Sequence, residues 1–212
     1  MDYQYAHPHG MDSQQIERLR NKISSYHPIT DASMEKILSL ISVRVIGKQD
    51  IFVAQGTVSR YFCFLDTGYM VSYTNDEDGK IYNKNIFTAG DWVGAMVSSI
   101  LQAPSHFTLK ALTECTILCI PYLKFRDLIF GIDDLKSFYI RYLEKNWVID
   151  KEAREVSLVM HSAQKRYAHL LDMHADIEDY VPLKDIASHL GITPTQLSRI
   201  RRNKTLNICK GI

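Results

Sequence analysis

A series of short β-rich runs separated by turn signals fills the chain from Val43 to Pro121, and it limits the fold more than any other feature. Turns are indicated at Gln55-Gly56, Asp66-Thr67-Gly68 and Ala89-Gly90-Asp91. The runs around them are Ile51-Phe52-Val53, Tyr61-Phe62-Cys63-Phe64-Leu65, Tyr69-Met70-Val71-Ser72-Tyr73 and Thr116-Ile117-Leu118-Cys119-Ile120. Many short strands at a spacing of roughly ten residues predict an antiparallel roll or barrel, not a parallel α/β sheet.

A long helix without Gly or Pro is predicted next, from Ile132 to about His161. Steps of three and four residues place an apolar stripe on it, formed by Leu135, Phe138, Tyr142, Ile149 and Val156. A helix of roughly 28 residues is about 42 Å long, more than one small roll can cover. We therefore expect the stripe to form a dimer interface, although a helix packed only along its own domain would show the same pattern. Lys145 and Glu152 interrupt the stripe and weigh against a strict coiled coil.

The stretch from Val181 to Asn203, VPLKDIASHLGITPTQLSRIRRN, predicts two short helices joined by a tight turn. Gly191 permits the positive φ that ends the first helix. Thr193 can cap the second helix, with Pro194 at its first position and Gln196 completing a capping box. A helix, a Gly-containing turn and a polar, basic second helix are the parts of a helix-turn-helix DNA reader.

Charge is concentrated at this end of the chain. Residues 180–212 carry six Lys and Arg against one Asp, a net charge of +5, whereas the remaining 179 residues carry −4. An αα-corner with a solvated basic face is the plain alternative, but the local charge favours nucleic acid. The predicted DNA contacts are Thr193, Thr195, Gln196, Ser198, Arg199, Arg201, Arg202 and Lys204. Among them, Arg199 suits guanine and Gln196 suits adenine, while Arg201 and Lys204 suit phosphates and Arg202, one turn after Arg199, suits either bases or phosphates.

A roll, a long helix and a C-terminal helix-turn-helix together resemble the Crp/Fnr family of bacterial transcription regulators. The resemblance is strongest in SAQKRYAHLL and VPLKDIASHLGITPTQLSRIRR, which are similar to the branch common in Bacteroidetes. In the roll it rests on Gly56, Gly68 and the run Phe87-Thr88-Ala89-Gly90-Asp91-Trp92-Val93-Gly94. It implies an α+β chain with a cyclic-nucleotide-binding-like jelly roll (1–131), a dimerisation helix (132–160) and a DNA-binding domain (161–212). It also implies a homodimer on a palindromic operator of double-stranded DNA, with RNA polymerase as a further partner.

The residues that hold a cyclic nucleotide in that family are missing here. Ala95 follows Gly94 where the family has a ribose-binding Glu, and Ser105-His106 stand where it has the phosphate-binding Arg pair. The candidate effector pocket, formed by Gly90, Gly94, Ala95, Ser105, His106 and Lys110, is therefore expected to take an unknown small molecule. A cyclic-nucleotide-responsive regulator with a rearranged pocket stays open as the alternative.

Composition argues against the remaining classes of protein. Four Cys, at 63, 115, 119 and 209, form no disulfide framework or cluster motif. His106 is the only His between Val43 and Pro121, so a metal-dependent cupin enzyme on the roll is not supported. We therefore expect no catalytic site, metal or cofactor. No apolar stretch reaches the ~20 residues of a membrane span, and no secretory signal is visible, so the expectation is a cytoplasmic protein.

Overall fold

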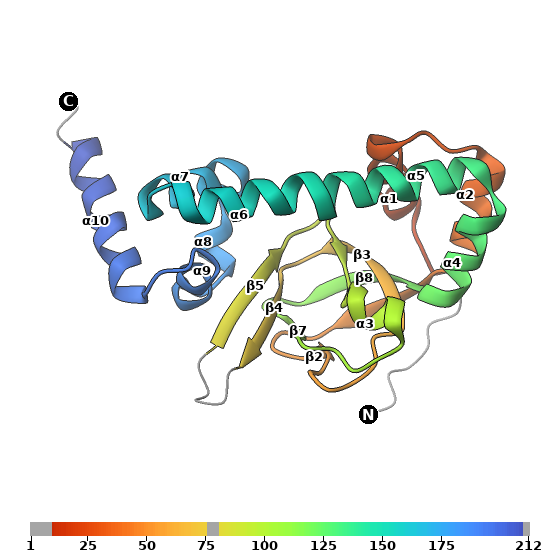
Figure 1. Ribbon diagram of the computed structural model, residues 1–212, viewed down its shortest axis with the longest axis horizontal. Helices are drawn as coiled ribbons and strands as arrows, with labels where there is room; N and C mark the ends of the chain where they lie inside the picture. Colours follow the sequence, from red (N-terminus) through yellow and green to blue (C-terminus); the bar gives the residue numbers. More distant parts are fainter. Residues whose placement is uncertain (1–9, 76–80, 210–212) are drawn as a thin grey trace.

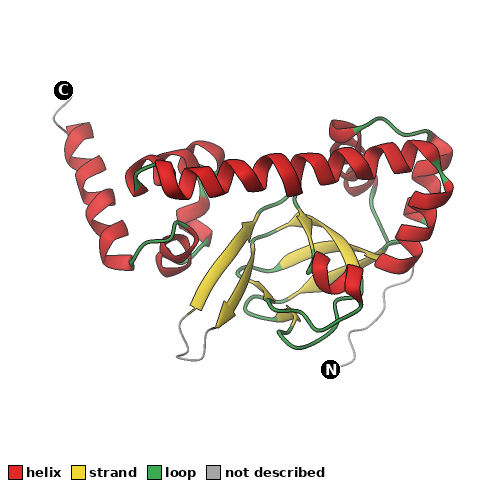
Figure 2. Cartoon of the chain, in the orientation of Figure 1, coloured by secondary structure: helices red, strands yellow, loops and turns green. Residues whose placement is uncertain are grey.

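Two antiparallel four-stranded sheets face each other in the computed structural model, which describes residues 10–75 and 81–209, with side chains as far as Asn203 (Figures 1 and 2). The strand order is β1-β8-β3-β6 in the first sheet and β2-β7-β4-β5 in the second. The strands are β1 (Ser42–Ile46), β2 (Ile51–Val53), β3 (Tyr61–Thr67), β4 (Met70–Asn75), β5 (Ile81–Phe87), β6 (Trp92–Val93), β7 (Thr108–Ala111) and β8 (Cys115–Pro121). The predicted α+β class with an antiparallel roll is confirmed.

The strand β3 is covered on both faces of the first sheet, which explains its unbroken apolar run. Phe62 and Phe64 point toward the helices, whereas Cys63 and Leu65 point toward the second sheet, and all four are almost fully buried. Cys63 also faces Cys119 of β8, with 3.4 Å between the two Sγ atoms. A strand covered on both sides cannot alternate between apolar and polar residues.

Helices cover the outer face of the first sheet. They are α1 (Ser13–Tyr26), α2 (Asp31–Leu38), α4 (Tyr122–Gly131) and the beginning of the long helix, while α3 (Met96–Leu101) lies between β6 and β7 in the chain. Arg18 ties α1 to β3, because its Nε and Nη2 donate to the two carboxylate oxygens of buried Asp66 at 2.7 and 3.0 Å. This bidentate geometry suits the planar guanidinium.

The long helix runs from Asp133 to Met160 across the roll (Figure 1). It consists of α5 (Asp133–Leu143), a wider π-helical segment η1 (Glu144–Ile149) and α6 (Asp150–Met160). Leu135, Phe138 and Tyr142 are buried against the chain's own helices and strands, so they have no area to offer a second subunit. Their assignment to a dimer interface is therefore wrong. Ile149 and Val156 are 57% and 50% exposed, so for these two residues the dimer interface stays a prediction.

Two features that the dimer argument did not take into account cause this difference. The N-terminal helices, together with α4, supply the cover that the roll alone was expected to lack. The π-helical segment also adds a residue to one turn, which rotates every later side chain relative to the earlier ones. Residues counted in steps of three and four from Leu135 therefore leave the core-facing side after Tyr142.

Four further helices complete the chain: α7 (Ala163–Met173), α8 (Ile177–Tyr180), α9 (Leu183–His189) and α10 (Pro194–Cys209). Figure 1 shows α9 lying beside β5, whereas α10 stands at the far end of the molecule, away from the roll. Their shared core includes Tyr167, Ile177, Ile186, Ala187 and Leu197.

Candidate DNA-reading helix and effector cavity

The turn between α9 and α10 has the geometry that the sequence indicates. Gly191 has φ +70°, and the Ile192 N–H donates to the Ala187 carbonyl at 3.0 Å. The predicted capping box is confirmed: the Gln196 N–H donates to Thr193 Oγ1 at 3.2 Å, and the Thr193 N–H donates to Gln196 Oε1 at 2.9 Å. Ala187 is fully buried, so α9 and α10 cross closely.

One face of α10 is open to solvent. Thr195, Ser198, Arg199 and Arg202 are exposed, while Leu197 of the opposite face is buried in the core of the unit. The side chain of Lys204 lies outside the described part of the chain. An exposed polar and basic face on a helix whose other face is fixed is the arrangement a DNA-reading helix requires.

Two predicted DNA contacts have other partners. Arg201 Nε lies 2.8 Å from a carboxylate oxygen of Glu178 in α8, and the Tyr167 hydroxyl donates to the same oxygen. Arg201 therefore holds α10 against α7 and α8. The Gln196 amide oxygen is engaged in the capping box, so only the amide NH₂ is available while that box persists; bidentate adenine reading needs both groups. Sequence reasoning identified the box without following this consequence.

Hydrogen bonds dock α9 on β5. The Ser188 hydroxyl accepts from the Asn83 N–H at 2.9 Å and donates to the Ile81 carbonyl at 3.2 Å. Asn83 Nδ2 donates to the carboxylate of Asp185 at 2.9 Å. Tyr69 of the roll stacks on Tyr180, with 5.0 Å between ring centroids. The roll and the C-terminal helices thus share a polar and an apolar contact.

Arg154 of the long helix joins the same contact. Its Nη1 donates to Asn85 Oδ1 at 2.7 Å, and its Nη2 lies 3.4 Å from His189 Nδ1 in α9. His189 also bonds to the backbone carbonyl of Lys84. Burial, reinforced by the Arg154 charge, lowers the pKa of His189 to about 3. The imidazole is therefore neutral near pH 7 and accepts from Arg154.

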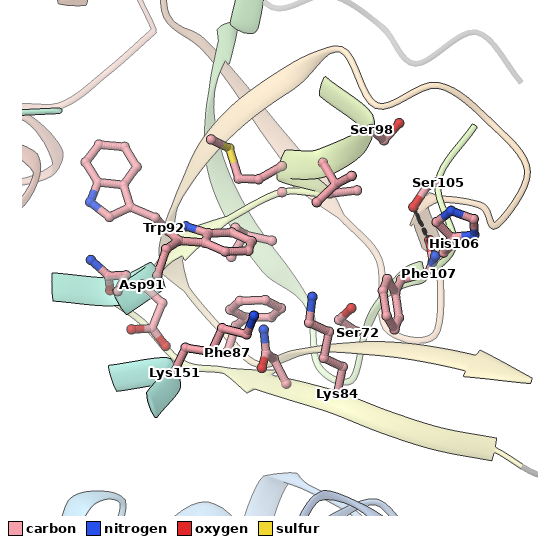
Figure 3. A pocket seen from close by; sticks show the side chains of 18 of the residues that line it. Ser72, Lys84, Phe87, Asp91, Trp92, Ser98, Ser105, His106, Phe107 and Lys151 are labelled. Carbon is pink, nitrogen blue, oxygen red and sulfur yellow. Dashed lines mark hydrogen bonds between the residues drawn. The ribbon is translucent and has the colours of Figure 1, made fainter. Parts of the chain in front are cut away.

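A cavity of about 560 Å³ opens between the roll and the long helix. Gly94, Ala95, Ser105 and His106 line it as predicted, but Gly90 and Lys110 do not. The Ser105 hydroxyl is held within its own loop, donating to the Phe107 carbonyl at 2.7 Å and accepting from the Phe107 N–H at 3.1 Å (Figure 3). This wall offers no guanidinium to a phosphate.

Cations from other elements also line the cavity, and the sequence reasoning missed them. Lys84 comes from β5 and Lys151 and Arg154 come from the long helix. A β-bulge places Lys84 there: Asn85 pairs with Ser72 and Asn83 with Tyr73, which leaves Lys84 without a partner on β4. Bulges re-aim side chains in this way. Figure 3 shows the Lys84 side chain rising from the strand into the cavity.

Burial lowers the pKa of Lys84, and the positive charges of Lys151 and Arg154 lower it further. Lys84 Nζ lies 4.5 Å from the centre of the Phe107 ring and 5.6 Å from that of Trp147. No sequence pattern marks this site, because a single Lys in a β-rich run is usually a solvated residue.

The described residues include no group of three or more His, Cys, Asp or Glu placed to hold a metal ion. Within the same part of the chain, no helix combines the length and apolarity needed to cross a membrane.

Comparison with known proteins agrees with this architecture. Residues 43–131 match the family "Cyclic nucleotide-binding domain". No curated relative matches the chain by sequence. Among solved structures, FixK2 of Bradyrhizobium japonicum is similar at 16% identity and a TM-score of 0.64, over 79% of this chain and 85% of its own.

Two further solved structures share the fold. The c-di-GMP-responsive global regulator CLP of Xanthomonas campestris has 14% identity and a TM-score of 0.63, over 84% of this chain and 93% of its own. The Thermus thermophilus catabolite activator protein has 14% identity and a TM-score of 0.52, over 88% and 87%. Residues 43–131 thus match the cyclic nucleotide-binding domain, and most of the chain shares its fold with these three proteins.

Proposed function

We propose that this protein is a DNA-binding transcription regulator of the Crp/Fnr type, in the branch found in Bacteroidetes, and that it is not an enzyme. It acts in the cytoplasm as a homodimer on a palindromic operator, with RNA polymerase as a further partner. Its sensor domain responds to a small molecule other than a conventionally bound cyclic nucleotide.

The exposed face of α10 carries this proposal. Thr195, Ser198 and Arg199 project from the N-terminal half of a helix whose apolar face is fixed by Leu197. In helix-turn-helix proteins the N-terminal part of the second helix enters the major groove. Arg199 then meets guanine O6 and N7, and Arg202, one turn later, meets bases or phosphates.

The second half of the long helix supports the dimer. Ile149 and Val156 follow one another at helical spacing, and Val159 and Met160 extend the apolar surface with 83% and 74% exposure. Side chains this exposed on one helix are typical of a face that a partner helix covers. Two copies related by a two-fold axis read half-sites about 34 Å apart.

A second candidate is a regulator that responds to a cyclic nucleotide through a rearranged pocket. The family match over residues 43–131 favours it, as does the cationic wall of the cavity. It differs from the first candidate in its effector and not in its DNA reading.

A selection of binding sites from random DNA, followed by affinity measurements at several salt concentrations, tests the DNA reading. Arg199→Ala is expected to relax the preference at particular base pairs, at a cost of about 1–3 kcal/mol for the preferred site. Lys204→Ala is the matched control. It is expected to weaken all sequences alike and to reduce the salt slope by about one.

The wild-type protein must select a palindromic site for the proposal to hold. If Arg199→Ala leaves both the affinity and the preferred sequence unchanged, α10 is not the reading helix. Thermal unfolding of each variant separates lost contacts from lost folding.

A further inference from the structure

We infer that the cavity between β5 and the long helix is a site for a small organic anion with an aromatic or apolar body, held by Lys84 and Arg154. The regulatory role of this site rests on the proposed function, because the inference names the class of effector that the proposed sensor domain binds. It places the anionic group at the cations of β5 and the long helix and not at Ser105 and His106.

The charges of these cations are not balanced within the described residues. No carboxylate of that part of the chain lies within 4.0 Å of Lys84 or of the Arg154 guanidinium. The carboxylates that line the cavity have partners of their own: Asp91 accepts from the Thr88 N–H at 2.8 Å, Asp150 pairs with Lys145, and Glu155 lies 3.8 Å from Lys151. Two half-buried cations without a counter-charge favour an anion between them.

The like charges also repel one another. Lys84 is partly removed from water and lies near Lys151 and Arg154, so each cation raises the free energy of the next. A bound carboxylate, sulfonate or phosphate relieves this repulsion and supplies the hydrogen-bond acceptor that Lys84 lacks.

The rest of the cavity lining favours a ligand whose body is aromatic or apolar. Lys84 Nζ lies over the rings of Phe107 and Trp147, and Phe87 and Trp92 line the cavity nearby (Figure 3). About 560 Å³ lies within the roughly 300–1,000 Å³ typical of small-molecule sites.

Fluorescence titration of the full-length protein with 8-anilinonaphthalene-1-sulfonate tests this inference, because the probe joins an anion to an aromatic body. Displacement by 1-naphthalenesulfonate is compared with displacement by neutral 1-naphthalenemethanol. We expect the sulfonate to compete at least tenfold more strongly. Lys84→Met, which keeps the side-chain length, is expected to weaken binding of the probe about tenfold or more, since a hydrogen bond to a charged group is lost.

Lys84→Arg retains the charge and is expected to keep most of the affinity. Lys136→Met, on the exposed surface of α5, is the matched control and is expected to leave the affinity unchanged. Equal competition by the two naphthyl compounds, or undiminished probe binding by a folded Lys84→Met, would overturn the inference. Thermal unfolding checks the folding of each variant, and Lys84→Gln replaces the Met variant if that one does not fold.

DNA binding without any probe is measured in parallel. Its absence would contradict the proposed function and leave the anion site standing. Intact DNA binding with no charge-dependent probe binding would contradict the anion site and leave the proposed function unaffected.

Discussion

Ser105 occupies a position where the family resemblance places an arginine. Its hydroxyl already donates a hydrogen bond to the Phe107 carbonyl and accepts one from the Phe107 N–H. His106 beside it lines the same wall. Ala95 lines the cavity where a carboxylate would bind the ribose hydroxyl. A cyclic phosphate in the usual pose therefore finds neither a bidentate donor nor a ribose acceptor.

Cyclic AMP is accordingly expected to bind weakly, with no saturation at micromolar concentration. Isothermal titration calorimetry on the purified protein measures this directly. Micromolar or tighter binding would show that the nucleotide has found other contacts, and its loss in Lys84→Met would assign those contacts to the cationic wall.

At the level of elements, the π-helical segment separates two faces of the long helix. Tyr142 before it is 3% exposed, whereas Ile149 after it is 57% exposed. The same substitution therefore has different consequences on the two sides.

Ile149→Asp is expected to dissociate the dimer without unfolding the chain, because it sets like charges against each other across the two-fold axis at a cost of several kcal/mol. Tyr142→Asp is the contrasting variant and is expected to unfold the roll, because it buries a charge in the core. Sedimentation velocity and thermal unfolding distinguish the two outcomes. A monomeric wild-type protein at micromolar concentration would contradict the dimer.

The contact between α9 and β5 is expected to weaken in acid. The pKa of His189 is about 3 when α9 is docked, against about 6.5 in an unfolded chain. Burial is the main cause of this low pKa, and the nearby Arg154 and His174 lower it further. Because the folded pKa is the lower one, this stabilisation is complete above about pH 6.5 and is lost as the pH falls from there toward 3.

Denaturant unfolding at pH 7.5 and 5.5 measures the effect. Between these values the wild-type protein is expected to lose about 1.4 kcal/mol more stability than His189→Gln, which cannot titrate. Equal losses in both proteins would mean that His189 does not carry the pH dependence.

For the whole molecule, the sequence was informative where local chemistry decides the structure. Short β-rich runs predicted the antiparallel roll, and Thr193, Gln196 and Gly191 predicted the turn before α10 in atomic detail. Packing between distant segments is not visible in any local pattern of the sequence. The cover that α1 provides depends on partners far away in the chain, and the bulge that turns Lys84 inward depends on the exact register of β5 against β4.

The same limit explains the missed link between the cavity and the C-terminal helices. Arg154 lines the cavity and also holds α9 through His189, so one guanidinium belongs to both sites. Nothing in the sequence around Arg154 distinguishes it from other basic residues on a helix.

The docking of α9 also protects the sheet. β5 is the last strand of its sheet, and a strand in that position presents unpaired backbone groups that can recruit strands of other molecules. Ser188 and His189 occupy the outward N–H of Asn83 and the carbonyls of Ile81 and Lys84. Any movement that frees the C-terminal helices from the roll therefore uncovers an unpaired strand edge, flanked by the half-exposed Ile81 and Tyr82. Release and protection against aggregation are opposed in this fold, and a lasting undocked state requires another cover for β5.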